Sequence, residues 1–129
     1  MNVLVDSSVW IDFFRGSDKV GHLDVLIEED LICTNDLILA ELVPLLRIKR
    51  QRKLVALLQT IQRLPMDIDW NEIVDFQIKC IRSGINQVGI PDLMIAQNAI
   101  QQGATIYALD KHFALMGNSL PLALLEPSK

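Results

Sequence analysis

Residues 2–16, NVLVDSSVWIDFFRG, join a short apolar run, an acid and the beginning of an apolar helix. The run at 2–5 is typical of a buried strand, and Ser7 or Ser8 can cap the helix that follows it. Gly16 is expected to end that helix. A buried strand that leads directly into a helix is the repeating unit of α/β domains, so this stretch indicates that fold class.

The same alternation continues along the chain. Further strands are predicted at 31–34, 64–66, 104–109 and 120–125, and further helices at 19–29, from 36 onward, at 52–63, 70–83 and 91–102, and after 110. Pro44 is expected to kink the helix that begins at 36 or to lie in its first turn. The alternation predicts one domain, residues 1–129, in which helices flank a central parallel sheet of four to five strands with right-handed crossovers.

The composition agrees with one folded domain. Half of the 129 residues are hydrophobic, and the mean hydropathy is +0.29, which excludes a disordered tail. No uncharged apolar run approaches the roughly 18 residues that a membrane span needs. The first residues lack the basic region of a signal peptide. We therefore expect a cytoplasmic protein. Cys33 and Cys80 lie in apolar surroundings without a second cysteine nearby, which predicts small buried residues and no zinc site.

The net charge of −4 argues against broad, non-specific binding to nucleic acid. Basic residues are nevertheless concentrated in one place. Five of the twelve fall within seven positions, namely Arg47, Lys49, Arg50, Arg52 and Lys53. This basic segment is either a solvated helix end or a patch that contacts phosphates beside an acidic site, and the sequence leaves both interpretations open.

Four acids stand where a helix begins or on the apolar face of one: Asp6, Glu41, Asp92 and Asp110. A carboxylate beside apolar side chains is costly unless a positive charge offsets it. No lysine or arginine lies near enough in the sequence to pair with all four. The four acids together therefore suggest a bound divalent cation.

Each acid also has a structural explanation. Asp6 and Asp110 follow predicted strands and Asp92 lies in a first helical turn, so each can be a cap or a charge favoured by the helix dipole. In an open α/β sheet, however, ligands bind outside the carboxyl ends of the strands. Glu41 lies within an apolar stripe, where it is expected to be paired, protonated or bound to a ligand, unless it snorkels at the edge of the stripe.

Carboxylates and water are the ligands that Mg²⁺ and Mn²⁺ prefer in proteins. Two such ions a few ångströms apart hold the attacking water and the leaving oxygen of a phosphodiester in line. The four acids therefore predict a metal-dependent nuclease site.

The ordered motifs of this chain resemble those of the PIN-domain ribonucleases, and most closely the VapC-type toxins of bacterial toxin–antitoxin pairs. The motifs are DSSVWID at 6–12 with RG at 15–16, LAEL at 39–42, DLMIA at 92–96 with GA at 103–104, and LDKHF at 109–113. Each is weak alone. The ordered set spans nearly the whole chain and is specific.

The resemblance implies an endoribonuclease that cleaves RNA with Mg²⁺ or Mn²⁺, forms a homodimer and is inhibited by a cognate antitoxin. It implies that Asp6, Glu41, Asp92 and Asp110 are the metal-binding and catalytic acids and that Ser8 is a polar group near Asp6. The basic segment would then contact RNA. The RNA target and the choice between the two metals are not readable from the sequence.

Two positions depart from the family pattern. Ala108 stands two residues before the last acid, where threonine or serine is common, and His112 stands two residues after it, where another aspartate is common. His112 is expected to be a turn or surface histidine more often than a site residue. Two alternatives compete with the nuclease: a catalytically inactive domain of the same fold that binds RNA or a partner, and a phosphorelay receiver domain.

The first predicted helix is apolar on more than one face, because it carries Val9, Trp10, Ile11, Phe13 and Phe14. A domain of this size has a limited interior in which to bury such a surface. We therefore expect another chain, a second copy or an antitoxin, to cover part of this helix.

Overall fold

A computed structural model describes residues 2–125, apart from the side chain of Lys19. Five strands form one sheet in which every neighbouring pair is parallel. The strands are β1 (Val3–Val5), β2 (Ile32–Thr34), β3 (Gln62–Arg63), β4 (Thr105–Tyr107) and β5 (Ala123–Leu124), in the order β3-β2-β1-β4-β5. The prediction of an α/β domain with a parallel sheet of four to five strands is confirmed.

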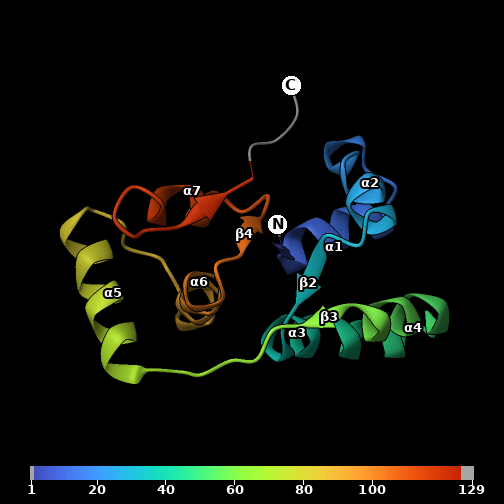
Figure 1. Cartoon of the computed structure of the whole chain (residues 1–129), viewed down its shortest axis with the longest axis horizontal. Coiled ribbons are helices and arrows are strands. Elements are labelled where there is room, and N and C mark those ends of the chain that lie inside the picture. The colour runs from blue at the N-terminus through green and yellow to red at the C-terminus, as the bar shows by residue number, and fades with distance from the viewer. Residues whose placement is uncertain (1, 126–129) are drawn as a thin grey trace.

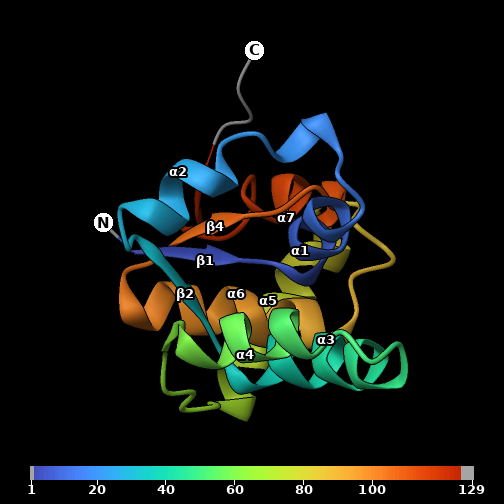
Figure 2. The same ribbon diagram turned by 90° about the vertical axis from the view of Figure 1, so that its right-hand side faces the viewer.

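Helices lie on both faces of this sheet, with α2 on one side of β1 and α6 on the other (Figures 1 and 2). The helices are α1 (Ser7–Phe14), α2 (Leu23–Glu28), α3 (Asp36–Ile48), α4 (Arg52–Thr60), α5 (Trp70–Arg82), α6 (Ile90–Gln102) and α7 (Lys111–Met116), with a short 3₁₀ helix, η1 (Asp18–Val20). None of them is both long enough and apolar enough to cross a membrane within residues 2–125.

The central strand β1 is inaccessible to solvent at all three of its residues. Its run of apolar side chains is the pattern of a parallel strand covered on both faces. The neighbouring helix α6 is also mostly buried, and it ends at Gly103, whose φ of 64° lies in the left-handed region that glycine adopts without strain. The core therefore lies around β1 and α6.

The strand order reverses between β1 and β4. The chain builds outward from β1 to β2 and β3, and then returns through α5 and α6 to place β4 on the other side of β1. The carboxyl ends of β1 and β4 thus form the crevice where open α/β sheets bind ligands. Asp6 follows β1 directly, and Asp110 follows β4 by three residues.

Three predicted elements differ from the structure. The helix predicted at 19–29 is divided into η1 and α2 by a turn at Gly21, because glycine is a poor helix former. The helix predicted at 52–63 ends at Thr60, and the strand predicted at 64–66 forms instead at Gln62–Arg63, where it pairs with β2. That pairing is a tertiary contact, which local sequence does not specify.

Pro44 neither begins α3 nor ends it. The helix continues from Asp36 to Ile48 with the proline inside it. Pro44 and Ala40 are both exposed, so water can reach the Ala40 carbonyl that lacks an amide partner four residues on. Solvent on this side of α3 makes the proline tolerable.

Both cysteines are fully buried and free, as predicted. Burial raises the pKa of the Cys33 thiol to about 11 and also raises that of Cys80. Because the thiolate is the reactive form, neither side chain should be alkylated by iodoacetamide at pH 8 in the native protein, whereas both should react in guanidinium. Mass spectrometry of the two samples tests this, and rapid labelling of the native protein would contradict it.

Candidate active site

The carboxylate of Asp6 is held by Ser8, two positions later in the sequence. Its Oδ2 atom accepts the Ser8 backbone N–H at 3.1 Å and the Ser8 hydroxyl at 2.7 Å. The Ser8 hydroxyl oxygen in turn accepts the backbone N–H of Leu109 at 3.1 Å. Asp6 thus caps α1 while Ser8 ties it to the segment that leads from β4 to Asp110. The predicted place of Ser8 beside Asp6 agrees with these contacts.

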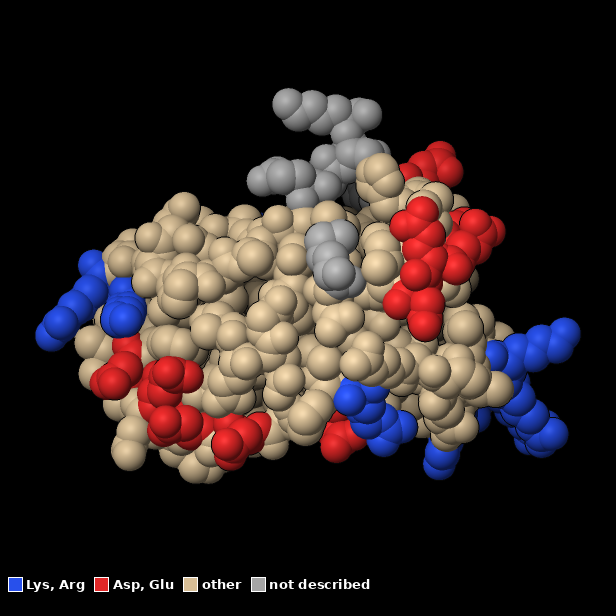
Figure 3. Space-filling view, viewed as in Figure 1, with Lys and Arg blue, Asp and Glu red and all other residues tan. Residues whose placement is uncertain are grey.

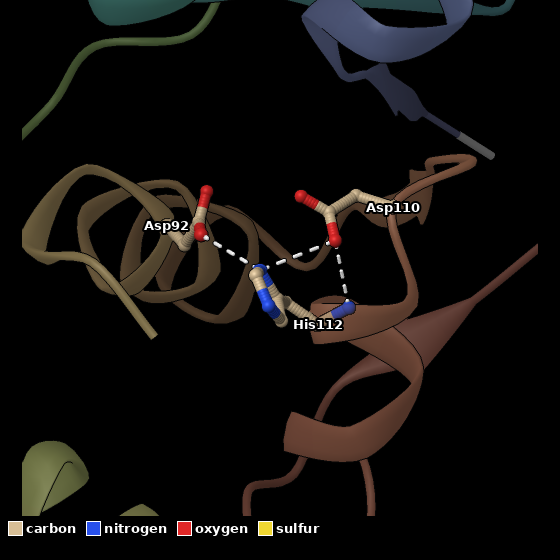
Figure 4. Close-up of side chains that lie close together, drawn as sticks. All are labelled: Asp92, Asp110 and His112. Atoms are coloured by element: carbon tan, nitrogen blue, oxygen red, sulfur yellow. Dashed lines mark hydrogen bonds and ion pairs between the residues drawn. The ribbon is translucent and has the colours of Figure 1, made fainter. Parts of the chain in front are cut away.

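Asp92, Asp110 and His112 lie together where α6 and α7 begin (Figure 4). The Nδ1 atom of His112 lies 3.2 Å from Asp110 Oδ1 and 3.6 Å from Asp92 Oδ2. Asp110 Oδ1 also accepts the His112 backbone N–H at 2.8 Å and so caps α7. His112, which the sequence leaves open between a turn or surface histidine and a site residue, lies between two of the acids with its side chain 26% exposed.

His112 is the residue of this site that local sequence reasoning missed. The position two residues after the last acid carries the signal, because it commonly holds an aspartate in the family that the sequence resembles. An aspartate that caps a helix accepts the backbone N–H of the residue two positions later, so that residue lies close to the capping carboxylate. The His112 N–H donates to Asp110 in this way. A histidine there retains a metal-binding nitrogen.

Glu41 lies at the border of the site rather than within an apolar stripe. The buried side chains of α3 are Ile38, Leu39, Leu42 and Leu46, and Glu41 is exposed beside them. It lines a groove of about 200 Å³ whose walls are mainly apolar side chains of α1, α3 and α4. Glu41 therefore lies at the edge of the apolar stripe, where the snorkelling alternative puts it. Its carboxylate nevertheless interacts with Asp6 and Asp92.

Mutual repulsion links the acids electrostatically. The pKa of Asp92 is raised, first by burial and then by the charges of Asp110 and Asp6, while His112 and a backbone N–H near Gly89 act in the opposite direction. The pKa of Glu41 is also raised, by partial desolvation and by repulsion from Asp6 and Asp92. Each of the four predicted acids therefore interacts electrostatically with at least one other.

The donor set fits a divalent cation. Side-chain ligand atoms of Asp92, Asp110 and His112 lie within 4.8 Å of one another, whereas Asp6 and Glu41 lie outside this group of three. The buried Nδ1 atom of His112 makes no well-directed hydrogen bond. Among the described side chains, no lysine or arginine forms an ion pair with any of the four acids. Carboxylate oxygens suit Mg²⁺ or Mn²⁺, whereas imidazole is a ligand that Zn²⁺, Fe²⁺ and Ni²⁺ prefer.

The basic segment lies at the other end of α3. Arg47, Lys49, Arg50, Arg52 and Lys53 are all exposed around the α3–α4 turn. In Figure 3 lysine and arginine side chains gather at the lower right, where these two helices meet in Figure 1. Lys49 lines the same groove as Glu41, whereas the arginines of the segment do not. Among the described side chains, no residue of the basic segment forms an ion pair with any of the four acids.

The family model described as the PIN domain matches residues 3–118 of this chain. No curated protein matches it by sequence. Several solved structures share the fold. One is VapBC2 from Rickettsia felis bound to a DNA fragment from the VapBC2 promoter. It is 19% identical to this chain, with a TM-score of 0.75, over 97% of this chain and 98% of that one.

Two further structures have comparable similarity. FitAcB from Neisseria gonorrhoeae is 21% identical with a TM-score of 0.69, over 97% of each chain. VapC20 from Mycobacterium tuberculosis, a toxin that cleaves the sarcin–ricin loop, is 18% identical with a TM-score of 0.62, over 90% of this chain and 95% of that one.

Replacing Asp92 with asparagine should stabilise the metal-free protein at pH 7 by up to about 4 °C in Tm, or roughly 1 kcal/mol. Folding raises the pKa of this carboxyl, so the native state favours its protonated form. The resulting stabilisation is present below the unfolded pKa and is lost as the pH rises through the folded value. The advantage of asparagine should therefore shrink as the pH falls toward about 4.

Thermal unfolding in EDTA, followed by circular dichroism at several pH values, measures this difference. Asp67→Asn is the matched control, because Asp67 is an exposed acid in the segment between β3 and α5. The control should leave Tm nearly unchanged at every pH. A lower Tm for Asp92→Asn at pH 7 would show that repulsion does not dominate at this position.

Proposed function

This chain belongs to the PIN domain family, and we propose that it is a metal-dependent endoribonuclease that acts as the toxin of a type II toxin–antitoxin pair. Membership of the family also excludes the phosphorelay receiver alternative. The observation that carries the proposal is that the charges of Asp6, Glu41, Asp92 and Asp110 interact, while no described lysine or arginine forms an ion pair with any of them. The fold likeness to VapC20, the toxin that cleaves the sarcin–ricin loop, supports it.

Asp6, Asp92 and Asp110 would hold the metal, with Glu41 at the edge of the site and His112 as an additional ligand. Bound Mg²⁺ or Mn²⁺ would lower the pKa of a water molecule and stabilise charge on the phosphodiester. The protein orients two of the acids by hydrogen bonds to one oxygen of each. Ser8 holds Asp6 Oδ2, and the His112 backbone N–H holds Asp110 Oδ1.

The second oxygens of Asp92 and Asp110 point away from the imidazole (Figure 4). No described group bonds to the second oxygen of Asp6. Asp6 and Asp110 therefore each have one oxygen held by hydrogen bonds and one free oxygen, which is what preorganised metal ligands require. RNA phosphodiesters would meet these oxygens at the carboxyl ends of β1 and β4, in the cytoplasm, where we expect the protein to act.

Asp6→Asn should lower RNA cleavage by at least about 100-fold while the fold survives. Losing a group that hydrogen-bonds to a metal ligand typically lowers metal affinity or activity about 10–100-fold, and losing the charge of the ligand itself should lower it at least as much. Asparagine keeps a side-chain oxygen that can accept the Ser8 N–H, so the cap of α1 is retained. Cleavage of a mixture of transfer, ribosomal and messenger RNA with Mg²⁺ or Mn²⁺, together with circular dichroism, measures both effects.

Asp67→Asn serves as the control, because it removes an acid outside the site, and EDTA should abolish cleavage by every active protein. Undiminished cleavage by Asp6→Asn would remove Asp6 from the site. If the wild-type protein cleaves no RNA with either metal, the alternative of a catalytically inactive PIN domain that binds RNA or a partner is correct.

A cognate antitoxin is the partner that the groove beside Glu41 would accept. The groove is lined by apolar side chains such as Ile11, Phe14 and Leu45, with Arg15 at its rim. An amphipathic or extended segment could bury its apolar side chains there and direct a basic side chain toward the acids. This placement follows from the groove and from the sequence resemblance to VapC-type toxins.

The surface available for a homodimer lies on α5 rather than on the first helix. Val9 and Trp10 of α1 are fully buried and its other aromatic residues are partly covered, although Ile11 and Phe14 still line the groove beside Glu41. Trp10 packs against Phe13 and Phe14 within the domain. In contrast, Trp70, Val74, Ile78 and Ile81 of α5 are 59%, 56%, 40% and 57% exposed.

The charge of α5 is arranged to favour self-association. Acidic residues lie toward its start, at Asp69, Glu72 and Asp75, and basic residues toward its end, at Lys79 and Arg82. The same separation is visible at the left of Figure 3, where blue atoms lie above red atoms. Two copies of α5 packed antiparallel about a two-fold axis would bury the apolar stripe and set each acidic end against a basic end.

Ile78→Glu should convert the homodimer to a monomer, because it places a charge in the middle of this stripe. Sedimentation velocity at micromolar concentration gives the result. Val25→Glu on α2 is the control, since Val25 is 49% exposed and lies outside α5. A monomeric wild-type protein, or an Ile78→Glu variant that remains dimeric, would refute this interface.

A further inference from the structure

The arginines of the basic segment surround a cavity of about 560 Å³ between the end of α3 and the start of α4. Arg47, Arg50 and Arg52 line it together with Gln51 and Gln59, and no acid is among the lining residues. None of the three arginines forms an ion pair with a described side chain. The cavity therefore has guanidinium and amide groups without a protein anion to pair with them.

The start of α4 adds to the positive potential of this cavity. Gln51 precedes the helix without capping it by a side-chain hydrogen bond, and the first turn holds no acid. The first N–H groups of this nine-residue helix therefore have no side-chain acceptor, and their partial positive charge is not neutralised. Guanidinium groups and free helix N–H groups both favour phosphate as their ligand.

The backbone presents Arg50 in an uncommon conformation. Its φ of 57° lies in the left-handed region, where glycine or asparagine is usual after a helix. Bonds from Arg50 N–H to the Arg47 carbonyl and from Gln51 N–H to the Leu46 carbonyl close α3 around this residue. The tight turn places Arg50, which precedes α4, and Arg52, which begins it, at the same cavity.

The cavity shares a lining residue with the groove beside Glu41. Gln51 lines both, and Lys49 and Glu41 line the groove. Arg47 follows Glu41 by six positions on α3, which is roughly 9 Å along the helix axis. A single RNA strand bound at the acids can therefore pass along the groove and place a nearby phosphate in the cavity.

We propose that this cavity is a phosphate-binding site, distinct from the metal-binding acids, which holds a phosphodiester of the RNA at a distance from the bond that is cut. The inference rests on the proposed ribonuclease function and divides the basic segment by role. Arg47, Arg50 and Arg52 bind the phosphate, Lys49 lies along the path of the strand, and Lys53 lines neither cavity nor groove.

The test compares the variant Arg47→Gln/Arg50→Asn/Arg52→Gln with the control Lys53→Gln. Asparagine is chosen at position 50 because it tolerates the left-handed conformation. Binding of a fluorescent single-stranded RNA is measured by anisotropy in EDTA, where no metal-dependent cleavage occurs, over a series of salt concentrations. Circular dichroism confirms that each variant is folded.

We expect the triple variant to bind RNA at least tenfold more weakly than the wild type at low salt. The slope of log affinity against log salt should become shallower by about 0.7 for each phosphate that the variant no longer neutralises. Lys53→Gln should change both quantities much less. In cleavage assays the triple variant should show a higher KM and nearly the same kcat, because the cavity binds RNA away from the reacting bond.

An unchanged salt slope in the triple variant, or an equal loss in Lys53→Gln, would overturn the proposal. The first result would mean that the arginines do not contact RNA, and the second that only the overall charge matters. If the wild type cleaves RNA while the triple variant binds it normally, the cavity proposal fails and the ribonuclease function stands. If the triple variant loses RNA binding while no protein cleaves RNA, the cavity stands and the ribonuclease function fails.

Discussion

The hydroxyl of Ser8 bonds to Leu109, which lies 101 residues later in the sequence. It donates to Asp6 after β1 and accepts the Leu109 N–H shortly after β4, so one small group joins the segments that follow the two central strands. The parallel pairing of β1 with β4 brings these segments together, and the Asp6 N–H also donates to the Tyr107 carbonyl. Removing the hydroxyl would leave the Leu109 N–H without this acceptor and Asp6 Oδ2 with the Ser8 backbone N–H alone, and a methyl group cannot replace the lost bonds.

The structural and functional explanations of the acids are compatible with each other. Asp6 and Asp110 are both genuine N-caps, because each accepts the backbone N–H of the residue two positions later. Each cap uses one carboxylate oxygen and leaves the other available. Helix termini therefore hold the acids in place and partly offset a repulsion that raises the pKa of Asp92 and Glu41. The site is electrostatically unfavourable without a cation, and capping makes it tolerable.

Periodicity and turn residues were sufficient to predict four of the five strands, most helices and the edge of the sheet at which Asp6 and Asp110 lie. Those features depend on local patterns, such as the uninterrupted apolar run of β1 and the glycine that ends α6. The position of β3 was not predictable in this way, because its register is fixed by pairing with β2. The contact between His112 and Asp92 was missed for a related reason, since it joins two helices that only the fold brings together. Buried amides were missed as well. Asn35 caps α3 and donates to Asn98 of α6, and a single amide in an apolar stretch gives no sign of its partner.

The pairing of β1 with β4 also determines when the protein can fold during its synthesis. Val3 lies opposite Thr105, so the central strand cannot acquire this neighbour until residue 105 has left the ribosome. Strands this short, paired over such sequence separations, close large loops before they gain stability, which slows folding. Asp6 is synthesised long before Asp110. A nascent chain that has not yet reached Asp110 therefore cannot bring these two acids together.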